Sequence, residues 1–155
     1  MNSHVETAVS LYNKGFNCAQ SSFGAYNEEN QLDPIQAAKL SSSFGGGFGK
    51  LGEVCGAFSG ICMAAGMIYG YDDPTDKTAK DQHYELVRDL GKRFTLVNGS
   101  LLCRDLLESN KVRPVIFSSE GVKVKECEHI VRSAVQLLDD VIRNKTPNLN
   151  KQSNP

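Results

Sequence analysis

Five cysteines are the side chains of this sequence best suited to chemistry: Cys18, Cys55, Cys62, Cys103 and Cys127. No two of them have the C-x-x-C spacing that is typical of thioredoxin-like or zinc-ribbon sites. A single cysteine is more often a small buried hydrophobe than a reactive group. Spacing alone therefore favours packing roles for all five cysteines. Only their positions on the expected helices distinguish candidate reactive cysteines from packing ones.

Cys55 follows a cluster of glycines and is expected in the first turn of a helix. Free backbone N–H groups and the helix dipole favour a thiolate at such a position. Glu53 works against this effect, because its carboxylate competes for the same dipole. The glycine loop could curl its amides toward Cys55 or let another sulfur or a ligand approach closely. The candidate cofactor-binding positions are Gly45, Gly46, Gly47 and Gly49.

The other cysteines fall on expected helix faces. Cys127 is near the start of the last helix, and Cys18 faces inward on a stripe of small residues. Cys103 shares a face with Leu106 and Leu107 in LLCRDLL. Cys62 lies halfway along an apolar helix, which indicates plain core packing.

Apolar residues recur with helical spacing along most of the chain, which predicts an all-α, single-domain bundle of about five main helices over residues 1–144. A flexible C-terminal tail is expected over 145–155. Two Asp-Pro pairs, at 33–34 and 73–74, indicate helix starts, and Asn98-Gly99 indicates a helix end. The stretch 108–121 lacks periodicity and is expected to be a loop. The main apolar stripes cover 5–26, 34–40, 54–70, 74–98 and 124–141.

The stretch 54–71 carries no charge and has nearly the length of a transmembrane helix. Its glycines and acidic flanks favour a buried central helix instead. Gly56, Gly60 and Ala64 recur at every fourth position, and such a ridge of small residues lets a second helix approach closely.

Composition excludes some function classes. Among 155 residues, 17 are basic and 18 acidic, the formal net charge is -1, and there is no Lys/Arg block, so nucleic acid is not expected as a partner. The N-terminus lacks the basic and apolar regions of a secretory signal, which favours a cytoplasmic protein without membrane attachment. A homodimer and a redox partner protein are the expected partners.

Other chemistries have weaker support. His4, His83 and His129 are far apart, and a lone histidine is more often a surface or packing residue than a ligand. His129 is two positions from Cys127 and could tune that thiol if the helix start is irregular. GGGFG lacks the GK[ST] of a phosphate-binding loop, and no strand is expected before it. The spacings of Ser, His and Asp residues give no support for a Ser/His/Asp triad.

Taken together, GFNCAQSSF, GEVCGAFSG, LLCRDLL and CEHIVRSAV resemble the C_GCAxxG_C_C family of redox-active proteins, named for a C…CGAxxG…C…C pattern. Cys55, Gly56, Ala57 and Gly60 match CGAxxG. The three other family cysteines fall on Cys18, Cys103 and Cys127, and Cys62 lies outside the pattern. The resemblance covers about residues 11–141 and implies redox activity.

Two function classes follow from this resemblance. In the first, Cys18, Cys55, Cys103 and Cys127 form a redox centre, as dithiol/disulfide pairs or as ligands of an iron–sulfur cluster. In the second, the same four thiolates hold zinc to lock the helices, and the protein is a binding module for a partner. Whether the protein is an enzyme stays open. In the cytosol a permanent disulfide is the least expected state.

Overall fold

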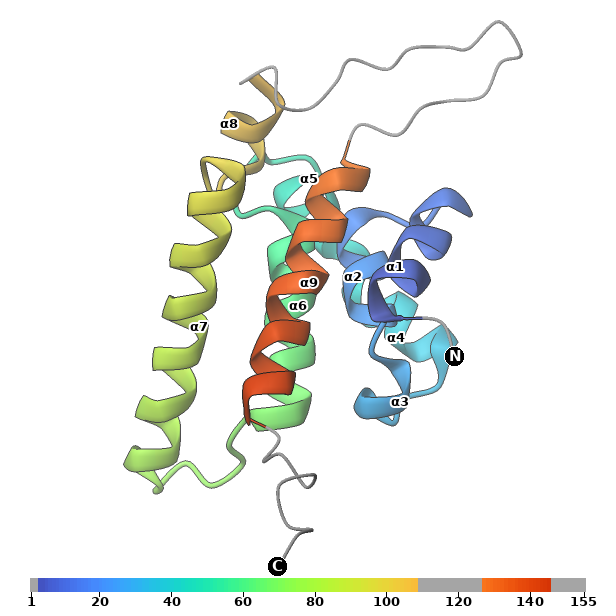
Figure 1. Cartoon of the computed structure of the whole chain (residues 1–155). Coiled ribbons are helices and arrows are strands. Elements are labelled where there is room, and N and C mark those ends of the chain that lie inside the picture. Colours follow the sequence, from blue (N-terminus) through green and yellow to red (C-terminus); the bar gives the residue numbers. More distant parts are fainter. Residues whose placement is uncertain (1–2, 109–126, 146–155) are drawn as a thin grey trace, which may run out of the picture.

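The protein is all-α in the computed structural model, which describes residues 3–108 and 127–145 (Figure 1). No strand occurs in these ranges; Val54 and Leu102 form an isolated antiparallel bridge. The helices are α1 (His4–Asn13), α2 (Cys18–Gly24), α3 (Asn27–Asn30), α4 (Pro34–Ser41), the 3-10 turn η1 (Ser42–Phe44), α5 (Gly45–Phe48), α6 (Gly56–Tyr69), α7 (Lys77–Asn98), α8 (Cys103–Glu108) and α9 (Glu128–Lys145).

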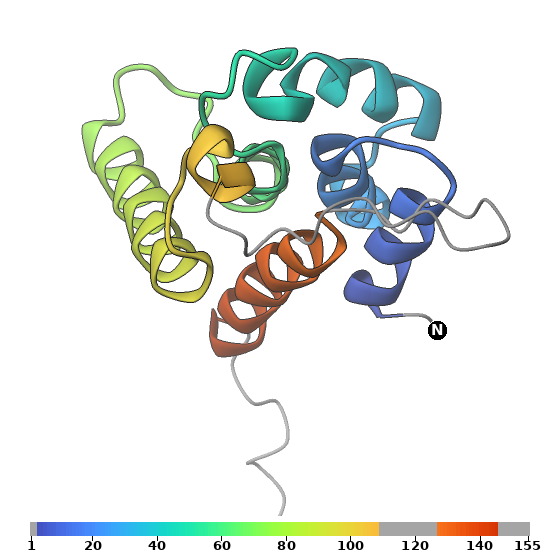
Figure 2. The same ribbon diagram turned by 90° about the horizontal axis from the view of Figure 1, so that it is seen from above.

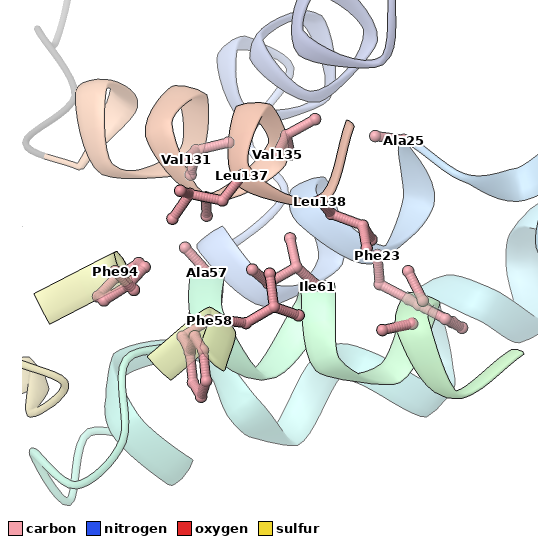
Figure 3. Close-up of a cluster of buried hydrophobic side chains, with 14 of the residues drawn as sticks. Phe23, Ala25, Ala57, Phe58, Ile61, Phe94, Val131, Val135, Leu137 and Leu138 are labelled. Atoms are coloured by element: carbon pink, nitrogen blue, oxygen red, sulfur yellow. The ribbon is translucent and has the colours of Figure 1, made fainter. Parts of the chain in front are cut away.

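Helix α6 is the central helix, as its uncharged sequence predicts. Seen from above, it is surrounded by α7, α9, α2 and the α4–α5 region (Figure 2). Its apolar side chains meet those of α2, α7 and α9 in one buried cluster, in which the Phe58 and Phe94 rings lie 5.4 Å apart (Figure 3). Ile61 is fully buried in this cluster, and burying a side chain of its size stabilises the fold by about 1.5–3 kcal/mol.

The predicted ridge of small residues on α6 packs against another helix. That helix is α2, and α2 and α6 form the most extensive helix–helix contact within residues 3–108 and 127–145. A Cβ atom at Gly60 would come within 2.8 Å of the Ala19 carbonyl oxygen and 3.0 Å of the Phe23 amide nitrogen. The two backbones can approach this closely only because Gly60 has no side chain.

The expectation of one continuous first helix over 5–26 is wrong. The helical conformation is interrupted at Gly15, which has a left-handed φ of 107°. A new helix, α2, then begins behind Asn17, whose side chain forms a capping box with Gln20. The apolar stripe continues across the break, so periodicity alone did not reveal it.

Of the two Asp-Pro pairs, the first is a helix start and the second is not. Asp33 caps α4 with Pro34 at the first helical position. Asp73 instead accepts hydrogen bonds from the backbone and hydroxyl of Thr75, and Asp76 caps α7. At its other end α7 stops at Gly99, which has a φ of 99°, as predicted.

The last helix begins at Glu128 and buries the predicted stripe, including Val131, Ala134, Leu138 and Val141. Of the predicted loop, Glu108 belongs to α8 and the rest lies outside the described residues. Of the predicted tail, Lys145 belongs to α9, and 146–155 also lie outside them. No helix in the described ranges is long and apolar enough to cross a membrane.

Candidate functional site

Cys55 is the N-cap residue of α6 and is 5% exposed. Its backbone N–H donates to the Leu101 carbonyl over 2.7 Å, which holds the start of α6 against the segment before α8. Burial, and then the neighbouring sulfur of Cys18, raises the pKa of Cys55 to about 12, although the backbone amides of Phe58 and Ala57 act in the opposite direction. The expected stabilisation of a Cys55 thiolate is thus reversed, because desolvation outweighs the helix start.

Cys18 is the first residue of α2 and is half-buried. Its Sγ lies against the residue that follows Cys55: a Cβ atom at Gly56 would come within 2.5 Å of it. The cysteine therefore lies at the contact between the starts of α2 and α6, as its place on the stripe of small residues indicates.

Cys103 is the first residue of α8 and is 8% exposed. Its N–H donates to the Glu53 carbonyl over 2.7 Å, next to the Val54–Leu102 bridge, so the segment before α6 holds the start of α8. Burial, and then the nearby Cys18 sulfur, raises the pKa of Cys103. Leu106 is buried with it, whereas Leu107, expected on the same face, is 46% exposed.

Cys127 directly precedes α9 and is half-buried. Its backbone N–H donates to the Tyr12 hydroxyl over 3.2 Å. Burial, and then the charge of Cys127, raises the pKa of Tyr12, and the Cys18 sulfur adds to this effect. In the sequence, Tyr12 is only one residue of the apolar stripe over 5–26. Its partner is more than a hundred residues away, so no local signal could have indicated this contact.

Cys62 differs from the other cysteines. It is half-buried in the middle of α6 and packs against the core, as predicted. Burial alone raises its pKa to about 12. Besides burial, the Cys18 sulfur raises the pKa of Cys55 and of Cys103, and the Cys127 sulfur adds to the effect on Cys55.

The glycine loop makes one left-handed turn. Five consecutive residues, 46–50, have φ between 58° and 70°, and two of them, Phe48 and Lys50, are not glycine. Left-handed backbone costs such residues about 1–2 kcal/mol each. Hydrogen bonds of 3.1 Å from the Gly52 and Glu53 amides to the carbonyls at 46 and 47 close the turn.

The loop glycines approach the chain itself. A Cβ atom at Gly45 would lie within 3 Å of the Asn17 side chain, and one at Gly47 would lie 2.6 Å from the Glu53 amide and 2.9 Å from the Cys103 Cβ. At Gly49 nothing lies within 4 Å. Their predicted role in cofactor binding stays a prediction, since the close neighbours here are protein atoms.

Metal binding by Cys18, Cys55, Cys103 and Cys127 stays a prediction. Thiolates are chemically suited to zinc and to iron–sulfur clusters. However, no three His, Cys, Asp or Glu side chains among residues 3–108 and 127–145 are placed so that they could hold a metal ion. We therefore derive no step through a metal.

A second polar cluster, which sequence analysis missed, lies at the other side of α1. His4 contacts Asp139 through Nδ1 over 2.7 Å and Glu29 through Nε2 over 2.9 Å. The Tyr26 hydroxyl donates to Asp139 and to the Val135 carbonyl. His4, Glu29 and Asp139 belong to three different helices, α1, α3 and α9, so sequence spacing carries no sign of the cluster. It borders a cavity of about 1070 Å³.

The fold and the cysteines define an all-α protein with four thiols at helix starts. A family model described as "Putative redox-active protein (C_GCAxxG_C_C)" matches residues 16–141, and the chain belongs to this family. The resemblance predicted from the cysteine pattern is thereby confirmed. No curated protein and no solved structure matches the chain.

Proposed function

We propose that the protein carries out thiol–disulfide redox chemistry at a centre formed by Cys18, Cys55, Cys103 and Cys127. One observation carries the proposal: the Cys18 Sγ lies against Gly56, the residue after Cys55, where a Cβ atom would come within 2.5 Å of it. Burial, and then the nearby Cys18 sulfur, also raises the pKa of both Cys55 and Cys103. This proximity supports a shared centre for the four family cysteines, which begin or directly precede four separate helices.

Cys55 and Cys103 are buried, which favours a disulfide that forms and breaks over thiols that stay ionised and reactive. Two neighbouring buried thiols resist ionisation, because both desolvation and the second sulfur oppose a negative charge. A disulfide carries no charge, so the oxidised pair avoids the cost of placing a negative charge in a buried site. The attacking group must still be a thiolate with access to solvent. Cys18, which is half-buried, has better access to solvent than Cys55 or Cys103.

Thiol titration tests the proposal. Protein purified without oxygen is equilibrated in glutathione buffers of graded potential, and its free thiols are counted by mass spectrometry after alkylation. We expect two thiols to disappear together in one two-electron transition, and Cys62 to stay alkylated throughout. The Cys62→Ser variant is the control and should show the same transition.

Two results would contradict this function. If all five thiols stay reduced at every potential, thiol–disulfide chemistry is absent. If the anaerobic protein instead shows visible absorption that Cys18→Ser abolishes, the centre is an iron–sulfur cluster; a colourless protein that contains stoichiometric zinc supports the metal-locked binding module.

A further inference from the structure

We propose that Cys18 and Cys55 are the pair that forms the reversible disulfide, with Cys18 as the thiol that meets an incoming low-molecular-weight disulfide and Cys55 as the thiol that resolves it. This inference rests on the proposed thiol–disulfide function and names the two residues that perform it. It assigns different tasks to cysteines that the family pattern treats alike.

The packing of α2 against α6 places these two residues together. Cys18 begins α2, Cys55 caps α6, and the two helices lie side by side (Figures 1 and 2). A disulfide requires Cα atoms no more than about 7 Å apart, which few helix pairs allow. Gly56 and Gly60 remove the side chains that would hold these helices apart, and the Cys18 sulfur lies directly against Gly56.

The two thiols differ in exposure, and this difference assigns their order. Cys55 is 5% exposed, so a solvent-borne disulfide cannot reach its sulfur easily. Cys18 is half-buried and is therefore the more exposed residue of the pair. Once Cys18 carries a mixed disulfide, the target of Cys55 is already adjacent, and the attack is intramolecular.

The other two cysteines are less suited to pair with Cys18. Cys103 packs against the glycine loop, where a Cβ atom at Gly47 would come within 2.9 Å of the Cys103 Cβ atom. Cys127 lies at the start of α9, where its N–H is bound by Tyr12. Among the sulfurs that influence Cys55, Cys18 has a larger effect than Cys127. We therefore assign neither Cys103 nor Cys127 to the pair.

The electron balance is simple. The Cys18 thiolate attacks one sulfur of the small disulfide RSSR, its S–S bond breaks, and the first RS⁻ leaves and takes up a proton. The Cys55 thiol then attacks the Cys18 sulfur and gives up its proton in this step, while the second RS⁻ leaves and takes up a proton. Two protein thiols are oxidised to one disulfide, and RSSR is reduced to two RSH by the same two electrons.

Glutathione disulfide is the probe for this order of events. The full chain, reduced and then treated with the probe, is digested without reduction and mapped by mass spectrometry. We expect a Cys18–Cys55 crosslink. In Cys55→Ser and Cys55→Ala the reaction should stop at a stable glutathione adduct on Cys18. In Cys18→Ser, modification of Cys55 should be slower by at least about tenfold, because its sulfur is buried.

Cys62→Ser is the matched control, since it removes a thiol from the same helix as Cys55 and should leave the crosslink intact. A crosslink of Cys18 to Cys103 or to Cys127 would overturn the pairing and leave the redox function standing. An adduct that forms first on Cys55 would overturn the order. If neither crosslink nor adduct forms on any cysteine, the proposed function itself fails.

Discussion

Gly60 of α6 lies so close to Ala19 of α2 that a Cβ atom at Gly60 would approach the Ala19 carbonyl oxygen within 2.8 Å. This contact holds α2 against the central helix, and with it the starts of both helices, where Cys18 and Cys55 are located. The placement of Cys18 beside the start of α6 therefore depends on a position that has no side chain.

Gly60→Ala should destabilise the protein by about 1–3 kcal/mol, because the added methyl group overpacks against the backbone of α2. Gly66→Ala is the matched control on the same helix, since its nearest neighbour is the His83 Nε2 at 4.0 Å. That variant should be slightly more stable, by about 0.5–1 kcal/mol, as alanine favours helix over glycine. Urea unfolding of both variants measures the difference, and equal midpoints would contradict the observed packing.

Within the glycine loop, Gly47→Ala should cost far more stability than Gly49→Ala. Both residues have left-handed φ angles, so the conformational cost of about 1–2 kcal/mol is shared. Only at Gly47 does the added Cβ meet the Glu53 backbone, at 2.6 Å. Thermal unfolding followed by circular dichroism should show a large loss for the first variant and a small one for the second. If both lose the same amount, the loop does not pack against Glu53 as described.

Tyr12→Phe should destabilise the protein by about 1 kcal/mol, because the N–H of Cys127 loses its hydroxyl acceptor at the start of α9. The control is Tyr84→Phe, which removes a hydroxyl whose hydrogen bond with Tyr71 is exposed and should have almost no effect. Urea unfolding of the two variants under reducing conditions compares them. Two indistinguishable curves would show that the Tyr12 contact contributes nothing.

The reduced protein should lose stability as the pH rises above about 8.5. Cys55 and Cys62 have pKa values of about 12 in the folded state, whereas an unfolded thiol has a pKa of about 8.5. Between these values the unfolded chain binds fewer protons than the folded one, so alkali favours unfolding, with a slope of up to about 1.4 kcal/mol per pH unit for each thiol. The stability that each thiol contributes is fully present below pH ~8.5.

Urea unfolding at pH 7.5 and at pH 9.5, with a reductant present, measures this slope. Cys62→Ala and Cys55→Ala should each show a smaller loss between the two pH values than the parent. A parent protein that is equally stable at both pH values would mean that these thiols are not buried.

Much of the helical structure could be predicted from local signals. Asp33-Pro34 starts a helix and Gly99 ends one, because capping and left-handed backbone depend on a few adjacent residues. Asp73-Pro74 was misleading because Asp73 forms a local turn with Thr75. The break at Gly15 was hidden by an apolar stripe that continues on both sides of it.

The all-α class, the central position of α6 and the family with its four cysteines could be predicted, since they depend on residue types and short spacings. The burial of the thiols, the contact of Cys18 with Gly56 and the hydrogen bond between Cys127 and Tyr12 appear only in the folded structure. Burial and contact depend on segments far apart in the chain. For this reason the helix start at Cys55 predicted a lowered pKa, whereas the surrounding helices, by excluding water, raise it.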